Sequence, residues 1–70
     1  MKIRAYSIFD TKAEAYSQPF FNGTDAQAVR SFTDLVQNPE HPFGKHPQDY
    51  TLFLVGTFED TEGLLKEITP

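Results

Sequence analysis

The segment Tyr50–Glu59, YTLFLVGTFE, carries the clearest strand signal in the chain and decides the fold class. Aromatic, branched and other large apolar residues alternate along it with period two, and this pattern is typical of extended structure. Two faces are expected. The first consists of Tyr50, Leu52, Leu54 and Phe58, and the second consists of Phe53 and Val55. The alternation therefore predicts a β-strand over residues 50–59.

The acidic stretch that follows this strand predicts a hairpin. Glu59–Gly63 reads EDTEG, and Gly63 stands where such a loop needs a positive φ angle. Leu64–Thr69 then predicts a final short strand that returns along the first. A run of acidic side chains is usually a solvated turn that also discourages edge pairing, and the alternative is a surface for a partner.

A second alternating segment lies at the N-terminus, over Lys2–Phe9. One side consists of Ile3, Ala5, Ser7 and Phe9, and the other consists of Arg4, Tyr6 and Ile8. Because both sides carry apolar groups, we expect this strand to be central in the sheet. Ala13–Gln18 predicts a short second strand, which Pro19 ends because proline lacks a backbone N–H donor.

A helix is predicted over Asp25–Gln37. Thr24 and Gln27 form a capping box at its start, and Asp25 in the first turn suits the helix dipole. Helical spacing gives one inward apolar face, which consists of Ala28, Val29, Phe32, Leu35 and Val36. The proline-rich stretch Asn38–Pro47 that follows predicts a loop with no regular structure.

These segments predict a single domain over residues 1–70, because a chain of this length holds only one apolar core. The economical architecture is α+β, with one helix packed on a small, mostly antiparallel sheet of three to four strands. A sheet this short leaves open edges. Pairing through such an edge would produce a homodimer.

Composition and charge narrow the classes of function. The chain has no cysteine and a net charge of −4, so it offers neither a thiolate metal site nor a strongly basic surface that coats DNA. No apolar run approaches the ~20 residues of a membrane span, and the N-terminus lacks the apolar core of a signal peptide. We therefore expect a protein of a reducing compartment with no membrane partner.

Catalysis and metal binding find little support in the sequence. Acidic residues occur singly or in the 59–62 loop, where full solvation leaves no perturbed pKa for acid–base chemistry. His41 and His46 lie in the proline-rich loop at a spacing that matches no metal-binding motif, and we interpret both as solvated. We expect a non-enzymatic protein with no cofactor and no metal.

A few basic and aromatic side chains form the candidate binding set. Its members are Arg4, Lys12 and Arg30 for phosphate and Tyr16, Phe20 and Phe21 for stacking. In single-stranded nucleic acid binding, bases stack on exposed rings while cations follow the backbone. The alternative is that the rings belong to the core and the cations are ordinary surface charges. Because adjacent side chains of an extended segment point to opposite sides, one of Phe20 and Phe21 could also anchor a protein partner. The alternative is that the chain turns here and buries both rings.

Three ordered segments together resemble a known viral family. They are Tyr6-Ser7-Ile8-x-Asp10-x-Lys12-Ala13-x-x-Tyr16-x-Gln18-Pro19-Phe20-Phe21, Ala28-x-Arg30-x-Phe32, and His46-Pro47-x-Asp49-Tyr50-x-Leu52-Phe53-x-x-Gly56-x-Phe58-x-Asp60-x-x-Gly63. The pattern resembles the small nonstructural protein of gokushoviruses, which are microviruses with single-stranded DNA genomes. The resemblance spans essentially the whole chain, and its motifs are specific in order and spacing.

The resemblance implies a biological process and brings no catalytic residues. It implies a protein made in the cytoplasm of the infected host bacterium, absent from the mature virion and equivalent to the microvirus packaging protein. Such a protein acts with the viral replication complex and the procapsid, and shifts double-stranded replication toward single-strand synthesis and packaging. We therefore expect an accessory protein that contacts DNA, the replication complex or both. The alternative is an acidic protein-interaction module that binds a host or viral protein without touching DNA.

Overall fold

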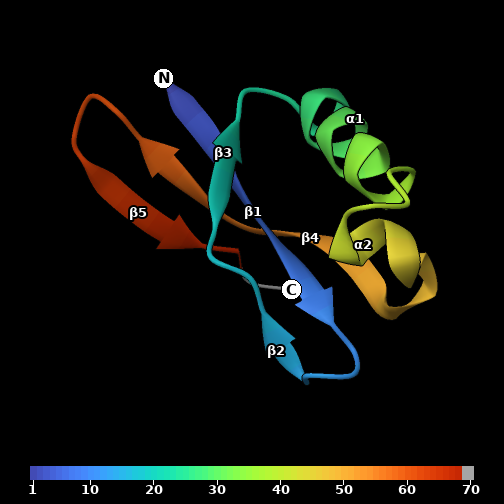
Figure 1. Cartoon of the computed structure of the whole chain (residues 1–70). Coiled ribbons are helices and arrows are strands. Elements are labelled where there is room, and N and C mark those ends of the chain that lie inside the picture. Colours follow the sequence, from blue (N-terminus) through green and yellow to red (C-terminus); the bar gives the residue numbers. More distant parts are fainter. Residues whose placement is uncertain (69–70) are drawn as a thin grey trace.

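The computed structural model describes residues 1–68, which form an α+β fold as predicted. The elements in chain order are β1 (Lys2–Asp10), β2 (Ala15–Tyr16), β3 (Phe20–Asn22), α1 (Asp25–Val36), α2 (Pro42–Lys45), a 3-10 helix (Pro47–Asp49), β4 (Tyr50–Glu59) and β5 (Leu64–Glu67). One main helix packs against a curled antiparallel sheet that resembles half of a barrel (Figure 1). The last strand was predicted to reach Thr69, which lies outside the described residues.

The strand β1 is the centre of the sheet, which confirms the expectation from its two apolar faces. The strand order is β2-β1-β4-β5, and β3 also pairs with β1, with every ladder antiparallel. Strands β1 and β4 pair along their full lengths and form the backbone of the sheet. The sheet therefore has five strands where three to four were predicted, because β3 adds a strand that the sequence pattern did not indicate.

The second strand ends before Pro19, as predicted, but the chain does not leave the sheet there. The expected strand Ala13–Gln18 is reduced to Ala15–Tyr16, and after the proline the chain rejoins the same neighbour as β3. Strands β2 and β3 thus lie one after the other along the edge of β1. Pro19 sits in the gap between them, where its missing N–H removes no ladder hydrogen bond.

Ser17 holds the chain against β1 in this gap. Its N–H donates to the Ile8 carbonyl oxygen at 2.8 Å, and its Oγ accepts from the Ile8 N–H at 3.0 Å. The buried Ser7 hydroxyl donates to the Ser17 carbonyl oxygen at 2.7 Å. Side-chain hydroxyls therefore replace ladder bonds where the two short strands are interrupted, and the buried polar group is satisfied.

A β-bulge in β4 corrects the predicted side of Phe58. The pairing of β1 with β4 shifts just before Tyr6, where Val55 is an extra residue in β4. An extra residue moves every side chain beyond it to the other face of the strand. Phe58 therefore lies opposite Ile3 and on the same face as Phe53, whereas strict alternation had placed it on the other face.

The start of α1 confirms the predicted capping box. The Thr24 Oγ1 accepts from the Gln27 N–H at 3.2 Å, and the Gln27 side-chain oxygen accepts from the Gly23 N–H at 3.1 Å. The helix ends at Val36 with Gln37 as its C-cap, one residue before the predicted end. These hydrogen bonds satisfy free N–H groups at the beginning of the helix.

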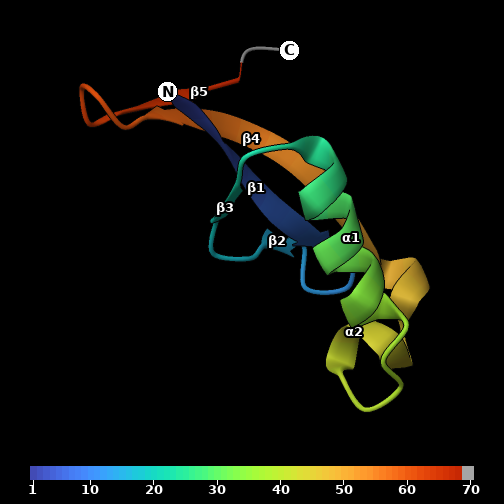
Figure 2. The ribbon, with the colours of Figure 1, turned by 90° about the horizontal axis from the view of Figure 1, so that it is seen from above.

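One side of β1 receives α1 (Figure 2). Ala28 is fully buried in this contact, and the Tyr6 hydroxyl donates to Asp25 Oδ1 at 2.6 Å. Val29 was predicted to face inward, but 53% of its surface is exposed. Of the predicted inward residues only Ala28 is fully buried and Phe32, Leu35 and Val36 are half-buried, so the buried face of α1 is narrower than predicted and leaves Val29 outside it.

The stretch Asn38–Pro47, predicted as an irregular loop, contains α2, and the 3-10 helix begins at its last residue. The helix α2 begins at Pro42, and His41 is its N-cap, whose Nδ1 accepts from the Phe43 N–H at 3.1 Å. His41 is therefore a half-buried capping residue and not the solvated loop residue that was expected. Gly44 lets α2 approach the end of α1, since a Cβ at this position would lie 1.6 Å from the Asn38 carbonyl oxygen.

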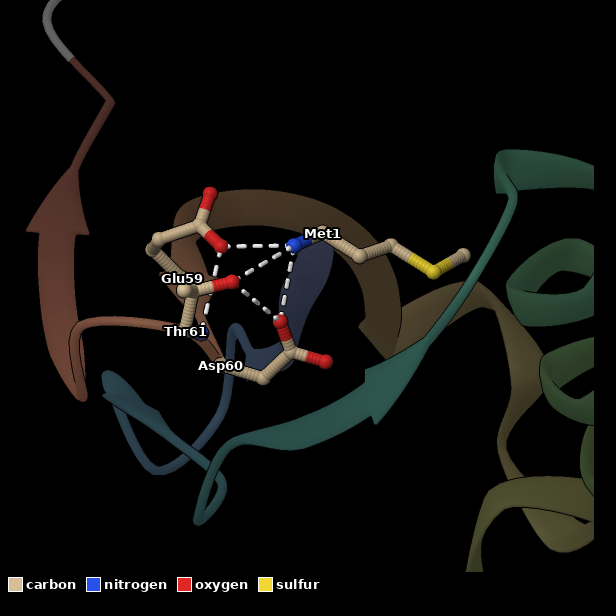
Figure 3. A network of polar contacts seen from close by, with 4 residues as sticks. All are labelled: Met1, Glu59, Asp60 and Thr61. Carbon is tan, nitrogen blue, oxygen red and sulfur yellow. Dashed lines mark hydrogen bonds and ion pairs between the residues drawn. The ribbon is translucent and has the colours of Figure 1, made fainter.

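The hairpin between β4 and β5 is confirmed, with Gly63 at a φ of 69°. Figure 3 shows a polar network at its start, where the Met1 ammonium donates to Glu59 Oε1 at 2.6 Å and to Asp60 Oδ1 at 2.7 Å. The ammonium group, together with the Thr61 N–H, lowers the pKa of Glu59 to about 2. The acidic loop is thus partly neutralised by the chain terminus beside it.

Candidate binding face

The face of the sheet turned away from α1 is open, and we call it the open face. Its side chains are Ile3, Ala5 and Phe9 of β1, Tyr16, Phe21, Phe53 and Phe58, and Leu65 of β5. Within residues 1–68 no helix covers this face, because α1 and α2 both lie on the other side of β1 and β4 (Figure 2). Contiguous apolar surface of this kind on a small protein marks a binding surface.

One end of the open face carries three aromatic rings in mutual contact, which we call the aromatic cluster. The ring centroid of Phe9 lies 4.8 Å from that of Tyr16 and 6.5 Å from that of Phe53, and the last two are 5.7 Å apart. These residues come from β1, β2 and β4, so the sheet itself sets their spacing. Tyr16 is 57% exposed and Phe53 is 40% exposed, so both present ring surface to the solvent.

The other end of the open face is hollowed between β3 and β5, and we call this region the apolar hollow. It has a volume of about 280 Å³, and its apolar walls include Ala5, Phe21, Val55 and Leu65. Phe21 is 49% exposed and Leu65 is 64% exposed. The ring of Phe21 also packs edge-on against that of Phe58, with 6.2 Å between the ring centroids. The open face therefore offers two surfaces of different shape, a cluster of rings and a concave hollow.

Comparison with protein families gives a match that covers nearly the whole chain. The Phage ORF5 protein family matches the chain over residues 3–70. The chain belongs to this family. Neither the comparison with curated proteins nor the comparison with solved structures gave a match. Because the family match covers nearly the whole chain, both ends of the open face lie within the matched region of this phage protein.

The three candidate stacking residues are separated in this Phage ORF5 family protein. Tyr16 lies in the aromatic cluster, and Phe21 lies in the apolar hollow at the other end of the same face. Phe20 points to the opposite side of the sheet, where its ring stacks on that of the buried Tyr6. The two ring centroids are 5.9 Å apart. The expectation that adjacent Phe20 and Phe21 point apart is confirmed, and Phe21 is the more exposed of the two.

The three candidate cations are also separated. Arg4 lies on the side of the sheet that faces α1, with its guanidinium 3.4 Å from Asp25 Oδ1. Arg30 is exposed on α1. Lys12 lies in the turn that joins β1 to β2, the two strands that supply Phe9 and Tyr16. Only Lys12 is therefore placed next to the aromatic cluster.

Phe53 is the functional candidate that the sequence analysis did not include. Its period-two position in β4 placed only Val55 on its face, and it did not predict a contact with β2. That contact depends on the pairing of β1 with both β2 and β4, which places Phe9 and Tyr16 beside Phe53. This cluster could be predicted only from the register of three strands, which the sequence pattern does not give.

Metal centres and membrane-spanning helices were also considered in the described part of the chain. Among residues 1–68, no three His, Asp or Glu side chains lie close enough together to hold a metal ion. No helix in the same range is long and apolar enough to cross a membrane. The exposed rings and the hollow make the open face the candidate functional surface in residues 1–68.

Proposed function

We propose that this Phage ORF5 family protein is a non-enzymatic accessory protein of single-stranded DNA synthesis and genome packaging in the host cytoplasm. In this proposal it binds single-stranded DNA through the aromatic cluster and acts beside the viral replication complex and the procapsid. The resemblance to the gokushovirus nonstructural protein supports the process, because those viruses package a single-stranded DNA genome. The aromatic cluster is the observation that supports direct contact with DNA.

The cluster has the properties of a stacking platform. Tyr16 and Phe53 are exposed, and the ring of Phe9 packs against both of them. A base that stacks on an exposed ring gains about 1–3 kcal/mol, whatever its identity. Because the rings project from strands of one sheet, they require little ordering when DNA arrives. The platform therefore favours single strands, whose bases are free to stack.

Charge limits the affinity that this platform can provide. The net charge of −4 repels phosphate, and Lys12 is the cation placed in the turn beside the cluster. Arg30 lies on α1, on the other side of the sheet, so DNA bound to the cluster does not meet it. We therefore expect moderate affinity with a shallow dependence on salt, carried mainly by stacking and one phosphate contact.

Truncation of one exposed ring tests the stacking role. Phe53→Ala should weaken binding of a dT oligonucleotide of about eight residues by roughly 1–3 kcal/mol, as fluorescence anisotropy would measure. Phe21→Ala removes an exposed ring from the other end of the open face and is the matched control. Equal losses in the two variants, or no loss with Phe53→Ala, would contradict the assignment to the cluster.

Removal of single cations tests the phosphate contact. Lys12→Ala should lower the slope of log affinity against log salt by about 0.7, because one phosphate contact to a single strand is lost. Arg30→Ala removes the same charge from α1 and should leave the slope unchanged. The slope would be measured by anisotropy across a salt series. Matching changes in both variants would show that only the overall charge acts on DNA.

The acidic charge also favours the second candidate, a module that binds a basic surface of a host or viral protein without touching DNA. The same experiments separate the two candidates. If neither single- nor double-stranded DNA binds at low salt, the DNA proposal fails. Capture of replication or capsid proteins in a pull-down, lost in an open-face variant with an intact fold, would then support the second candidate.

A further inference from the structure

The apolar hollow lies between two edges of the sheet that have no further partner strand within residues 1–68. There β3 pairs only with β1, and β5 pairs only with β4. Figure 2 shows β5 on one side of β1 and β4 and β3 on the other. The exposed residues Phe21 and Leu65 therefore stand next to strands that still have hydrogen-bonding capacity. Both the apolar surface and the strand edges favour a protein partner at this place.

The surface area of the whole molecule indicates how large this partner contact is. The chain exposes 5142 Å², whereas a folded monomer of 8.0 kDa is expected to expose about 4,450 Å². Its radius of gyration is 13.0 Å, against about 11 Å for a compact domain of this length. The excess of about 700 Å² is close to the roughly 800 Å² that each partner buries in a standard interface.

The core of the single chain is small, which gives a reason for such a contact. The hydrophobic residues with nearly complete burial are Ala5, Tyr6, Ile8 and Ala28. No large side chain reaches full burial among the described residues. Chains of this size commonly gain the missing apolar burial by association with a second subunit.

Charge identifies the kind of partner. Lys66 and Glu67 also border the hollow, and the pairing with β4 turns the Glu67 side chain toward the open face and the Lys66 side chain away from it. A phosphate ligand finds no excess of positive charge there. Two copies of the chain, each with a net charge of −4, repel one another over most of their surfaces, and this largely apolar hollow is where they can meet.

We propose that a second copy of this chain covers the apolar hollow, so that the protein is a two-fold symmetric homodimer in solution. Leu65 and Phe21 lie near the centre of the interface, and the aromatic cluster lies at the other end of the open face, away from it. This inference does not depend on the proposed DNA binding. It assigns the two ends of the open face to different partners.

Sedimentation velocity over a concentration series tests the homodimer. The unmodified protein should sediment with twice the monomer mass at micromolar concentration and above. Leu65→Glu introduces a charge at the centre of the interface, and its apparent dimer affinity should fall at least tenfold. Leu64→Glu is the matched control, because Leu64 is 45% exposed on the same strand but its side chain points to the opposite face. This variant should remain dimeric.

Two results would overturn the homodimer. One is a monomeric mass of the unmodified protein at every concentration up to about a millimolar, and the other is dimerisation of Leu65→Glu as strong as that of Leu64→Glu. Because a charged variant can also lose its fold, amide NMR shifts of the unmodified protein on dilution provide a second readout. The shifts should concentrate on β3 and β5, and shifts confined to α1 or α2 would contradict the proposal.

Discussion

At the scale of single residues, the carboxylate of Asp25 connects the helix to the sheet. It accepts a hydrogen bond from the Tyr6 hydroxyl at 2.6 Å and lies 3.4 Å from the Arg4 guanidinium. Its position in the first turn of α1 adds a favourable interaction with the helix dipole. The sequence showed Arg4 as a free cation, because nothing in a linear pattern places it beside a residue of the distant helix. Its contact in the folded chain is structural.

The same contact makes stability depend on alkaline pH. Burial, together with the hydrogen bond to Asp25, raises the pKa of Tyr6 to about 12, from 10.0 in an unfolded chain. Because the folded state holds the neutral phenol, this contribution is complete below pH 10 and is lost between about pH 10 and pH 12. Urea unfolding at a series of pH values should show this loss.

The variant Tyr6→Phe isolates the contribution of the phenol. It should lower the free energy of unfolding at neutral pH by about 1.5–3 kcal/mol, since a hydrogen bond to a carboxylate is lost. The difference between this variant and the unmodified protein should then shrink as the pH rises from 10 to 12. Parallel pH profiles would show that Tyr6 does not control the alkaline transition.

At the scale of elements, strong local patterns were sufficient for β1, α1, β4 and the β4–β5 hairpin. The strands have period-two alternation, the helix has its capping box, and the hairpin has Gly63. The parts that could not be predicted depend on contacts between distant segments. Pairing with β1 makes β3 a strand although it has only three residues, and the bulge at Val55 moves Phe58 to the other face. Neither effect leaves a periodic signal in the sequence.

The approach of α2 to the end of α1 predicts that Gly44 has a role in stability. Gly44→Ala would place a Cβ 1.6 Å from the Asn38 carbonyl oxygen, so the backbone must shift. We expect a loss of roughly 1–3 kcal/mol in the free energy of unfolding, measured in urea. Gly23→Ala is the control, because its Cβ would meet only the Gln27 side-chain oxygen at 3.5 Å. Similar stability of the two variants would contradict the close approach.

At the scale of the whole molecule, the sheet curls without closing, and the open face is the consequence. Four of the seven phenylalanines line this face, and they are Phe9, Phe21, Phe53 and Phe58. The sequence contained the candidate residues Tyr16 and Phe21, but it could not show that they lie at opposite ends of one surface. It also grouped Arg4 and Arg30 with them, and the fold places both away from the open face. The sequence could therefore predict which types of residue take part in binding. Which of them lie together on one surface depends on the register of the strands.

The measurement that most directly tests the central claim is an NMR titration of isotope-labelled protein with a short dT oligonucleotide. The claim is that single-stranded DNA binds at the aromatic cluster. We predict that the largest amide shift changes fall on Phe9, Tyr16 and Phe53 and on the turn that contains Lys12, with small changes along α1. Shift changes concentrated on α1 or α2, or no change at millimolar oligonucleotide, would contradict the account.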